Sequence, residues 1–464
     1  MGSDRGLFKP LEANRGGMAL SVTLFFDVAS PYCYIAHEIL VRYQDLVGLD
    51  IRLIPVSLDH LFKIAGNNLP ERACPNKKLY VESDLVSYAE FSQVKLHSSA
   101  EYKFNTRLAQ ALLVLLREKF PTNFQEYLSA LWEAAQERGL DVSDHKVLAN
   151  TLEAAFANPP DAQKLISKAS TYLSLLDKNT QDAYRAGAYG LPYMTTQHHE
   201  TGQSMGFFGC GRIEMALASL GLGYQGPVPT RAPIWAPIRP HARLQFAFDV
   251  LSPYAYFAYK IFKRYERIWA LDIDYIPVHM PTLFQESGNH GPIYGCENKK
   301  IYTLKDLPLL AKHFNVALRI PDKFPCNTIP CQALLLIIKE RCPSMFDHAL
   351  ELLWDATMSL NMRVEDPAVI LAIVRPIFSP SIPLQDWVVE AYGPIATERI
   401  IVATKSLVAR GAHGLPYFIT QTSQNTHERH FFGSDRIDAL AHHLHLPYHY
   451  TIPESTSLGL MSSL

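Results

Sequence analysis

A long internal repeat restricts the fold of this chain more than any other feature. The segment 26–34, FDVASPYCY, returns as FDVLSPYAY at 248–256, so Ser30 and Ser252 lie 222 positions apart. Five separated motifs in near-constant register predict a chain built by duplication. The other four are Gly66-Asn67 with Gly288-Asn289, Asn76-Lys77-Lys78 with Asn298-Lys299-Lys300, Gly190-Leu191-Pro192-Tyr193 with Gly414-Leu415-Pro416-Tyr417, and Phe207-Phe208-Gly209 with Phe431-Phe432-Gly433.

Domain boundaries follow from this repeat. A length of 464 residues suits two domains of roughly 200 residues each. We place them at 21–225 and 244–450, with an N-terminal extension at 1–20 and a C-terminal tail at 451–464. The segment 226–243 between them contains five prolines. Prolines cannot continue a helix or a central strand, so we expect an extended, semi-rigid linker.

The composition excludes several classes of function. Apolar residues make up 48% of the chain, and the formal net charge is −2. We therefore expect a globular protein that does not bind nucleic acid or anionic membranes. No apolar run approaches the roughly 20 residues that span a bilayer, which predicts a soluble protein without membrane insertion. Residues 1–20 lack the apolar core of a secretory signal, and the C-terminal Ser-Ser-Leu only partly matches a peroxisomal signal.

The seven cysteines are scattered and form no C-x-x-C pair. This spacing argues against a zinc site and against a dithiol redox motif, so we expect no metal. An odd number of cysteines without a signal indicates a reducing compartment rather than a disulfide framework. Cys33 follows Ser30 by one helical turn, and we expect its thiol to be buried as a small apolar group.

Each copy begins with a strand–helix–strand pattern. In the first copy, apolar strands are expected at 22–28 and 51–56. The helix between them starts at Ser30-Pro31, because serine can cap free N–H groups and proline needs no partner at the first helical position. Such a βαβ unit is expected to have parallel strands.

The rest of each copy is mainly helical. Residues 105–187 carry apolar residues at helical spacing throughout, which predicts an all-α insertion. Two short strands at 193–196 and 205–208 and a helix from about Arg212 complete the copy. The second copy repeats the plan over 244–446. The expected fold class is therefore α/β.

Taken together, the motifs resemble a known family. A βαβ unit, a helical insert and a ββα unit, with Leu-Pro before the third strand, resemble a thioredoxin fold. More narrowly, the SPY, SGN, NKK, GLP and FGSDR motifs resemble the kappa class of glutathione transferases. That class is related to disulfide oxidases and to 2-hydroxychromene-2-carboxylate isomerases. The resemblance covers nearly all of 22–225 and 244–447. It implies two tandem thioredoxin-like domains, each with an all-α helical insertion, and glutathione as co-substrate.

The resemblance implies that Ser252 and Ser30 are catalytic. A thiol with a pKa near 8.5 is mostly protonated at neutral pH, so a transferase must stabilise the thiolate. A helix N-terminus supplies roughly half a positive charge and free N–H groups. A serine there can also point its hydroxyl at a bound sulfur. Ser-Pro alone is more often only a helix cap, and the surrounding motifs favour the catalytic role.

Three residues of the second copy are implied to bind the rest of the tripeptide. In this fold the peptide bond before Pro416 is cis, and the backbone of Leu415 can pair with the cysteinyl residue as a short added strand. Asn289 is implied to make a polar contact, and Lys299 to approach the glycine carboxylate. The nearby Glu297 would weaken this positive field if it pointed inward.

The two copies differ at the last motif. Ser434 and Asp435 are implied to bind the α-carboxylate and the ammonium of the γ-glutamyl group. The first copy has Cys210 and Gly211 there, which replaces a hydroxyl by a weak donor and removes the carboxylate. Losing a charged hydrogen bond costs roughly 1.5–3 kcal/mol, or about ten- to a hundredfold in affinity. We predict a weakened first site and a complete second one. The first copy keeps the other implied binding residues, Asn67, Lys77 and Leu191.

Three functions remain open from the sequence. The leading hypothesis is a glutathione transferase that adds the glutathione thiolate to small-molecule electrophiles or reduces small peroxides with it. The alternatives are a glutathione-dependent isomerase of the 2-hydroxychromene-2-carboxylate type and a non-catalytic glutathione-binding scaffold. The resemblance further implies an intramolecular pseudo-dimer of the halves or a homodimer. It also implies a mitochondrial or peroxisomal location, with the cytoplasm as an alternative.

Overall fold

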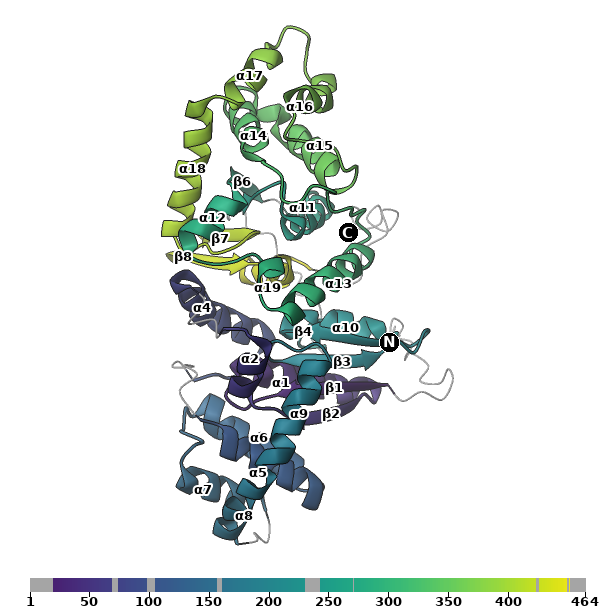
Figure 1. Cartoon of the computed structure of the whole chain (residues 1–464), viewed down its shortest axis with the longest axis vertical. Helices are drawn as coiled ribbons and strands as arrows, with labels where there is room; N and C mark the ends of the chain where they lie inside the picture. Colours follow the sequence, from purple (N-terminus) through teal and green to yellow (C-terminus); the bar gives the residue numbers. More distant parts are fainter. Residues whose placement is uncertain are drawn as a thin grey trace, which may run out of the picture. The chain divides into compact units, whose positions relative to one another are not determined.

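The computed structural model describes residues 20–68, 74–97, 105–156, 161–229, 243–269, 271–422, 425–448 and 450. These residues form two compact units. The first takes the described parts of 1–67, 89–231 and 449–464, and the second those of 68–88 and 232–448. In Figure 1 each unit contains one β-sheet, with its helical insertion to one side of the sheet. The expected extension (apart from residue 20), most of the linker and the tail lie outside the described residues.

The sheet of the first unit has four strands in the order β2-β1-β3-β4. Strand β1 (Ser21–Phe26) runs parallel to β2 (Asp50–Pro55) and antiparallel to β3 (Tyr193–Gln197). Strand β4 (Ser204–Phe208) continues the sheet antiparallel to β3. Because β1 lies inside the sheet, most of its side chains are buried, as expected of a central strand.

The second unit repeats this topology. Its order is β6-β5-β7-β8, in which β5 (Arg243–Phe248) runs parallel to β6 (Asp272–Pro277). Strands β7 (Tyr417–Thr422) and β8 (Asn425–Phe432) are antiparallel. Two sheets with the same strand order confirm the predicted α/β class of two tandem thioredoxin-like domains.

The helices of the two repeats also correspond. Helices α1 (Pro31–Val47) and α11 (Pro253–Tyr265) follow the first strands. Helices α10 (Ile213–Ser219) and α19 (Ile437–His443) close the repeats. None of the helices in the described ranges is long and apolar enough to cross a bilayer. The insertions consist of α5 (Arg107–Lys119), α6 (Phe124–Trp132), α7 (His145–Ala155), α8 (Ala162–Ala169) and α9 (Leu173–Arg185), and of α14 (Ile329–Arg341), α15 (Phe346–Met358), α16 (Pro367–Val374), α17 (Leu384–Ala391) and α18 (Pro394–Ala409).

A buried glutamine attaches each insertion to its sheet. The side-chain amide of Gln332 donates to the carbonyls of Phe248 and Val278, both at 2.8 Å. Gln110 makes the equivalent pair of bonds in the first unit. Buried carbonyls without a partner are unfavourable, so this amide joins the ends of two parallel strands to the first insertion helix.

The glycine of the repeated Gly-Asn motif ends a helix. Helix α2 (Leu58–Ala65) ends at Gly66, and α12 (Met280–Ser287) ends at Gly288. The two glycines have φ values of 64° and 68°. This left-handed conformation favours glycine because it lacks a Cβ atom. The motif therefore sets the point at which the chain leaves the helix and presents the asparagine.

Helix α4 (Pro75–Ser92) belongs to both units. Its residues 75–88 pack in the second unit, although the repeat register assigns them to the first copy. Tyr80 is buried in a cluster with Val278 and Tyr417, and its hydroxyl accepts a hydrogen bond from the backbone N–H of Phe432 at 2.9 Å. The equivalent helix of the second repeat is α13 (Glu297–His313).

Candidate functional site

Ser252 caps the N-terminus of α11. Its Oγ accepts a hydrogen bond from the backbone N–H of Ala255 at 3.2 Å, and Pro253 occupies the first helical position. The same hydroxyl donates to the carbonyl of Leu415 at 3.5 Å. The residue is only 2% exposed. The structure therefore brings together two predicted residues, and it also confirms the expected helix cap.

Ser30 holds the same position in the first unit. Its Oγ accepts a hydrogen bond from the backbone N–H of Cys33 at 3.3 Å.

Cys33 is fully buried, as expected, and burial raises the pKa of its thiol far above the ordinary range. All seven cysteines are reduced, and the described residues contain no group of three or more His, Cys, Asp or Glu residues that could hold a metal.

A buried aspartate holds the loop before each serine, and our sequence reasoning missed it. One oxygen of Asp249 accepts from the N–H of Leu251 at 3.0 Å. The other accepts from the N–H of Met280 and the hydroxyl of Thr328, at 2.8 and 3.0 Å. The carboxylate thus joins the Ser252 loop to the start of α12 and to the insertion, and burial raises its pKa.

Asp27 plays the same part in the first unit. It accepts hydrogen bonds from the N–H groups of Ala29 and Leu58 and from the hydroxyl of Thr106, at 2.7–3.0 Å. Burial raises the pKa of Asp27 to about 6. The signal for both aspartates was present in the sequence, because they belong to the repeated FDVxSPY motif.

The predicted asparagines hold the backbone just ahead of the Leu-Pro motif. The amide of Asn289 donates to the carbonyl of His413 at 2.6 Å, and that of Asn67 to the carbonyl of Tyr189 at 2.7 Å. The bonds from Leu415 to Pro416 and from Leu191 to Pro192 are cis, as expected of the fold. Each asparagine therefore positions the strand-like edge that the leucine presents.

Ser434 opens a short 3-10 turn, η7 (Ser434–Arg436), that leads into α19. The preceding Gly433 has φ 96° and donates its N–H to the carbonyl of Pro416 at 3.0 Å. Within the described part of the chain, the Oγ of Ser434 is buried and has no hydrogen-bond partner. An unpartnered buried hydroxyl is unfavourable, so this atom can gain from a ligand.

The first repeat differs at this position in structure as well as in sequence. The buried thiol of Cys210 donates to the carbonyl of Tyr32 at 3.2 Å. The equivalent Ser434 leaves its hydroxyl without such a bond, and Asp435 beside it pairs with Arg436 at 2.9 Å. The thiol thus has a hydrogen-bond partner in one repeat, while the hydroxyl of the other has none among the residues that the structure describes.

The two predicted lysines lie in the same unit. Lys299 is on the first turn of α13, and burial lowers its pKa. Lys77, predicted for the first site, belongs to the second unit, whereas Ser30, Asn67 and Leu191 belong to the first.

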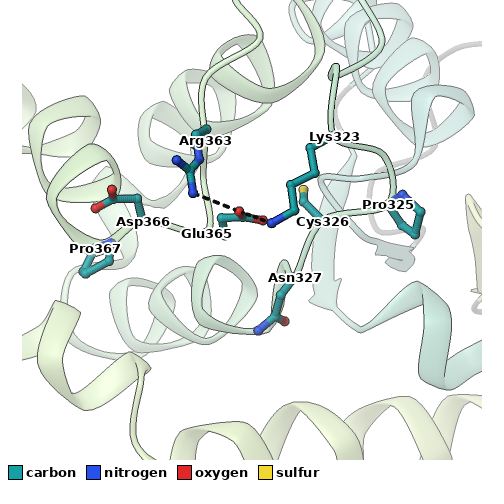
Figure 2. Close-up of a pocket in the computed structure, with 8 residues that line it drawn as sticks. All are labelled: Lys323, Pro325, Cys326, Asn327, Arg363, Glu365, Asp366 and Pro367. Carbon is teal, nitrogen blue, oxygen red and sulfur yellow. Dashed lines mark hydrogen bonds and ion pairs between the residues drawn. The ribbon is translucent and has the colours of Figure 1, made fainter.

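A pocket of about 600 Å³ in the second unit contains none of the predicted residues. Figure 2 shows Glu365 between Lys323 and Arg363, which it pairs with at 2.7 and 3.3 Å. Both cations of this pocket are therefore paired with the same carboxylate. The remaining lining residues are Pro325, Cys326, Asn327, Asp366 and Pro367.

Comparison with known proteins agrees with this architecture. The family described as DSBA-like thioredoxin domain matches twice, over residues 21–220 and 243–445. Human glutathione S-transferase kappa 1 is 29% identical over 221 residues, which are 46% of this chain and 96% of the human protein. The rat protein of the same name is 31% identical over 213 residues, or 44% and 93% of the two chains. The 2-hydroxychromene-2-carboxylate isomerase of Sphingobium xenophagum is 23% identical over 202 residues, or 43% and 97%.

The fold, the internal repeat and the family match define a protein with two DSBA-like thioredoxin domains in tandem. The two matches to the family together cover most of the chain. The chain belongs to this family, and within it to the group of the kappa-class glutathione transferases. Each of these relatives is about as long as one repeat, so the present chain contains two units of the kind that they contain once.

Proposed function

We propose that the second repeat binds glutathione and transfers its thiolate to a small-molecule electrophile. The observation that carries this proposal is the buried hydroxyl of Ser434, which has no hydrogen-bond partner in the described ranges of the chain. It lies in the same unit as the helix cap Ser252 and its neighbour Leu415. A helix cap alone would be satisfied without a ligand, whereas a buried hydroxyl without a partner gains a hydrogen bond when a ligand arrives.

The N-terminus of α11 supplies the electrostatic part of the mechanism. Its free N–H groups and the helix dipole favour an anion at this point. The Ser252 hydroxyl makes only a long bond, 3.5 Å, to the Leu415 carbonyl, and it can donate to a sulfur anion instead. This lowers the pKa of the glutathione thiol, whose proton leaves to water. The thiolate then forms a C–S bond with the electrophile, whose leaving group departs with the bonding electrons.

The other predicted residues hold the two ends of the tripeptide. The Leu415 backbone pairs with the cysteinyl residue, while Ser434 and Asp435 bind the γ-glutamyl carboxylate and ammonium. Arg436 pairs with Asp435 at 2.9 Å and keeps its carboxylate in place. The first repeat lacks both Ser434 and Asp435 equivalents, so we assign the strong site to the second repeat.

The test is a pH titration of bound glutathione in the full chain, followed by the ultraviolet absorbance of the thiolate. We expect the wild-type chain to lower the thiol pKa by at least about one unit from its free value. Ser252→Ala should return it towards that value and slow conjugation to an aryl halide. Ser30→Ala is the matched control and should leave both quantities nearly unchanged.

Two results would contradict the proposal. The chain could fail to bind glutathione at millimolar concentration, or Ser30→Ala could have the larger effect. Normal thiolate formation with no conjugation, but with turnover of a 2-hydroxychromene-2-carboxylate, would replace transfer by the isomerase activity named for one relative.

A further inference from the structure

The hydroxyl of Tyr80 joins α4 to the end of strand β8. It accepts a hydrogen bond from the backbone N–H of Phe432 at 2.9 Å and donates one to Oδ1 of Asp84 at 2.8 Å. The side chain is buried, and burial raises the pKa of Tyr80 well above its ordinary value. The hydroxyl therefore keeps its proton at physiological pH and can make both bonds at once.

Strand β8 needs such an acceptor because it lies at an edge of the described sheet, with β7 as its neighbour. An N–H that points away from β7 finds no partner within this sheet, and Tyr80 supplies one to Phe432. Phe432 is the last residue of β8 and lies two positions before Ser434. The bond therefore fixes the place at which the strand ends and the turn η7 begins.

Asp84 connects the same hydroxyl to the other end of η7. The Oδ1 atom that accepts from Tyr80 also accepts from Nε of Arg436 at 2.8 Å. Nη1 of Arg436 in turn donates to Oδ2 of Asp435 at 2.9 Å. One hydrogen-bond network thus holds both ends of this turn. Between these ends lies the buried hydroxyl of Ser434, for which the described residues offer no hydrogen-bond partner.

The first turn of α4 is held against the other half of the candidate site. The side-chain amide of Asn76 donates to the carbonyls of Val408 and Ala412, at 2.7 and 3.0 Å. Ala412 precedes Leu415 by three residues, so this contact lies just ahead of the predicted peptide edge. Tyr80 follows Asn76 by one helical turn. Its hydroxyl is therefore presented by a helix whose position is itself fixed relative to that edge.

We propose that Tyr80, a residue of the first copy, is a positioning residue for γ-glutamyl recognition in the second unit. Its hydroxyl acts through Phe432 and Asp84, and it sets η7 so that Ser434 and Asp435 meet the γ-glutamyl group together. The inference rests on the proposed function for the identity of this ligand. Hydrogen bonds weaken steeply when their geometry is distorted. A displaced turn should therefore weaken the binding of the γ-glutamyl group and spare the rest of the peptide.

The test compares glutathione with cysteinylglycine, which lacks the γ-glutamyl group, by calorimetry on the full chain. The weaker dipeptide is measured by its competition with glutathione. We expect Tyr80→Phe to weaken glutathione binding roughly tenfold and to leave the binding of the dipeptide nearly unchanged. The matched control is Ser83→Ala, which removes a hydroxyl that bonds to the backbone of α4 itself, and it should match the wild type. Unchanged glutathione binding, or equal weakening of both ligands, would overturn the proposal.

A second arm needs no ligand and separates this inference from the proposed function. Hydrogen exchange followed by mass spectrometry measures the protection of the backbone amides of 430–437 in the free chain. Tyr80→Phe removes the acceptor of the Phe432 N–H, so we expect exchange in this segment to become several-fold faster. Exchange in the equivalent segment 206–213 should not change, and Ser83→Ala should alter neither segment. Faster exchange in a chain that binds no glutathione would disprove only the proposed function, whereas unchanged exchange would disprove this inference.

Discussion

The carboxylate of Asp84 accepts two hydrogen bonds from the guanidinium of Arg436. Nε donates to Oδ1 at 2.8 Å, and Nη2 donates to Oδ2 at 3.1 Å. Asp84 is buried, and the guanidinium also stacks over the ring of Tyr88 at 4.5 Å. Arg436 directly follows Ser434 and Asp435. The ion pair therefore ties α4, which begins in the first repeat, to the turn that carries the predicted γ-glutamyl site.

Removing this carboxylate should destabilise the second unit. Asp84→Ala leaves Arg436 largely buried without its main partner, and breaking a buried pair in this way costs about 3–5 kcal/mol. Urea denaturation followed by tryptophan fluorescence measures the loss. The exposed neighbour Glu82 supplies the control Glu82→Gln, for which we expect no change beyond about 0.5 kcal/mol. Equal losses in the free energy of unfolding of the two variants would show that the ion pair of Asp84 and Arg436 stabilises the unit no more than an exposed side chain does.

Restoring the lost motif should create a second glutathione site. In Cys210→Ser/Gly211→Asp the first repeat regains the hydroxyl and the carboxylate that its counterpart has. Gly211 is not among the glycines with positive φ, so aspartate fits its backbone. We expect calorimetry to show one strong site in the wild type and two in this variant. With Ser434→Ala/Asp435→Ala added, the new site alone should remain. Two sites of similar affinity in the wild type would refute the predicted asymmetry.

Ionisation of Asp27 should make the first unit less stable as the pH rises. Burial raises the pKa of Asp27 in the folded protein from 3.8 to about 6. Between these values the folded state binds more protons than the unfolded state, so the free energy of unfolding falls with increasing pH, by about 3 kcal/mol in total.

The variant Asp27→Asn isolates this contribution. This variant should be less stable than the wild type. The backbone N–H of Leu58 donates to a carboxylate oxygen of Asp27, and in the variant the side-chain NH2 group of asparagine would stand opposite this N–H, so that two donors face each other. Its free energy of unfolding should nevertheless vary less between pH 4 and 6. Denaturation curves at four or five pH values test this, and a profile parallel to that of the wild type would contradict the assignment.

A side chain at Gly288 should strain the end of α12. The residue has φ 68°, and no atom of the described residues lies within 4 Å of the position that a Cβ atom would take. The cost of Gly288→Ala is therefore conformational and should be about 1 kcal/mol. Gly223 is equally open but has no positive φ, so Gly223→Ala is the control and should be neutral. A loss in the control as large as in Gly288→Ala would exclude this explanation.

Local patterns were sufficient for much of the fold. The predicted limits of the strands, helices and insertions lie within a few residues of the observed ones. Ser-Pro caps and apolar periodicity predict them well because both act over short distances in the chain. The same patterns marked Ser252 and Leu415 through their repetition, whereas Ser434 stood out because the first copy has Cys210 in its place. They did not reveal the roles of Asp249 and Gln332, because their partners lie tens of residues away.

The amino-acid sequence by itself determined the duplication, the α/β class and the family, because each depends on residue identity and spacing. Only the tertiary structure decided which residues share a site. It placed Lys77 and Asp84 in the second unit, because the burial of Tyr80 and the pairing of Asp84 outweigh continuity along the chain. It also gave the thiol of Cys210 a hydrogen-bond partner, whereas the hydroxyl of Ser434 has none within the described part of the chain. Such differences depend on the distances between side chains, which only the packed fold defines.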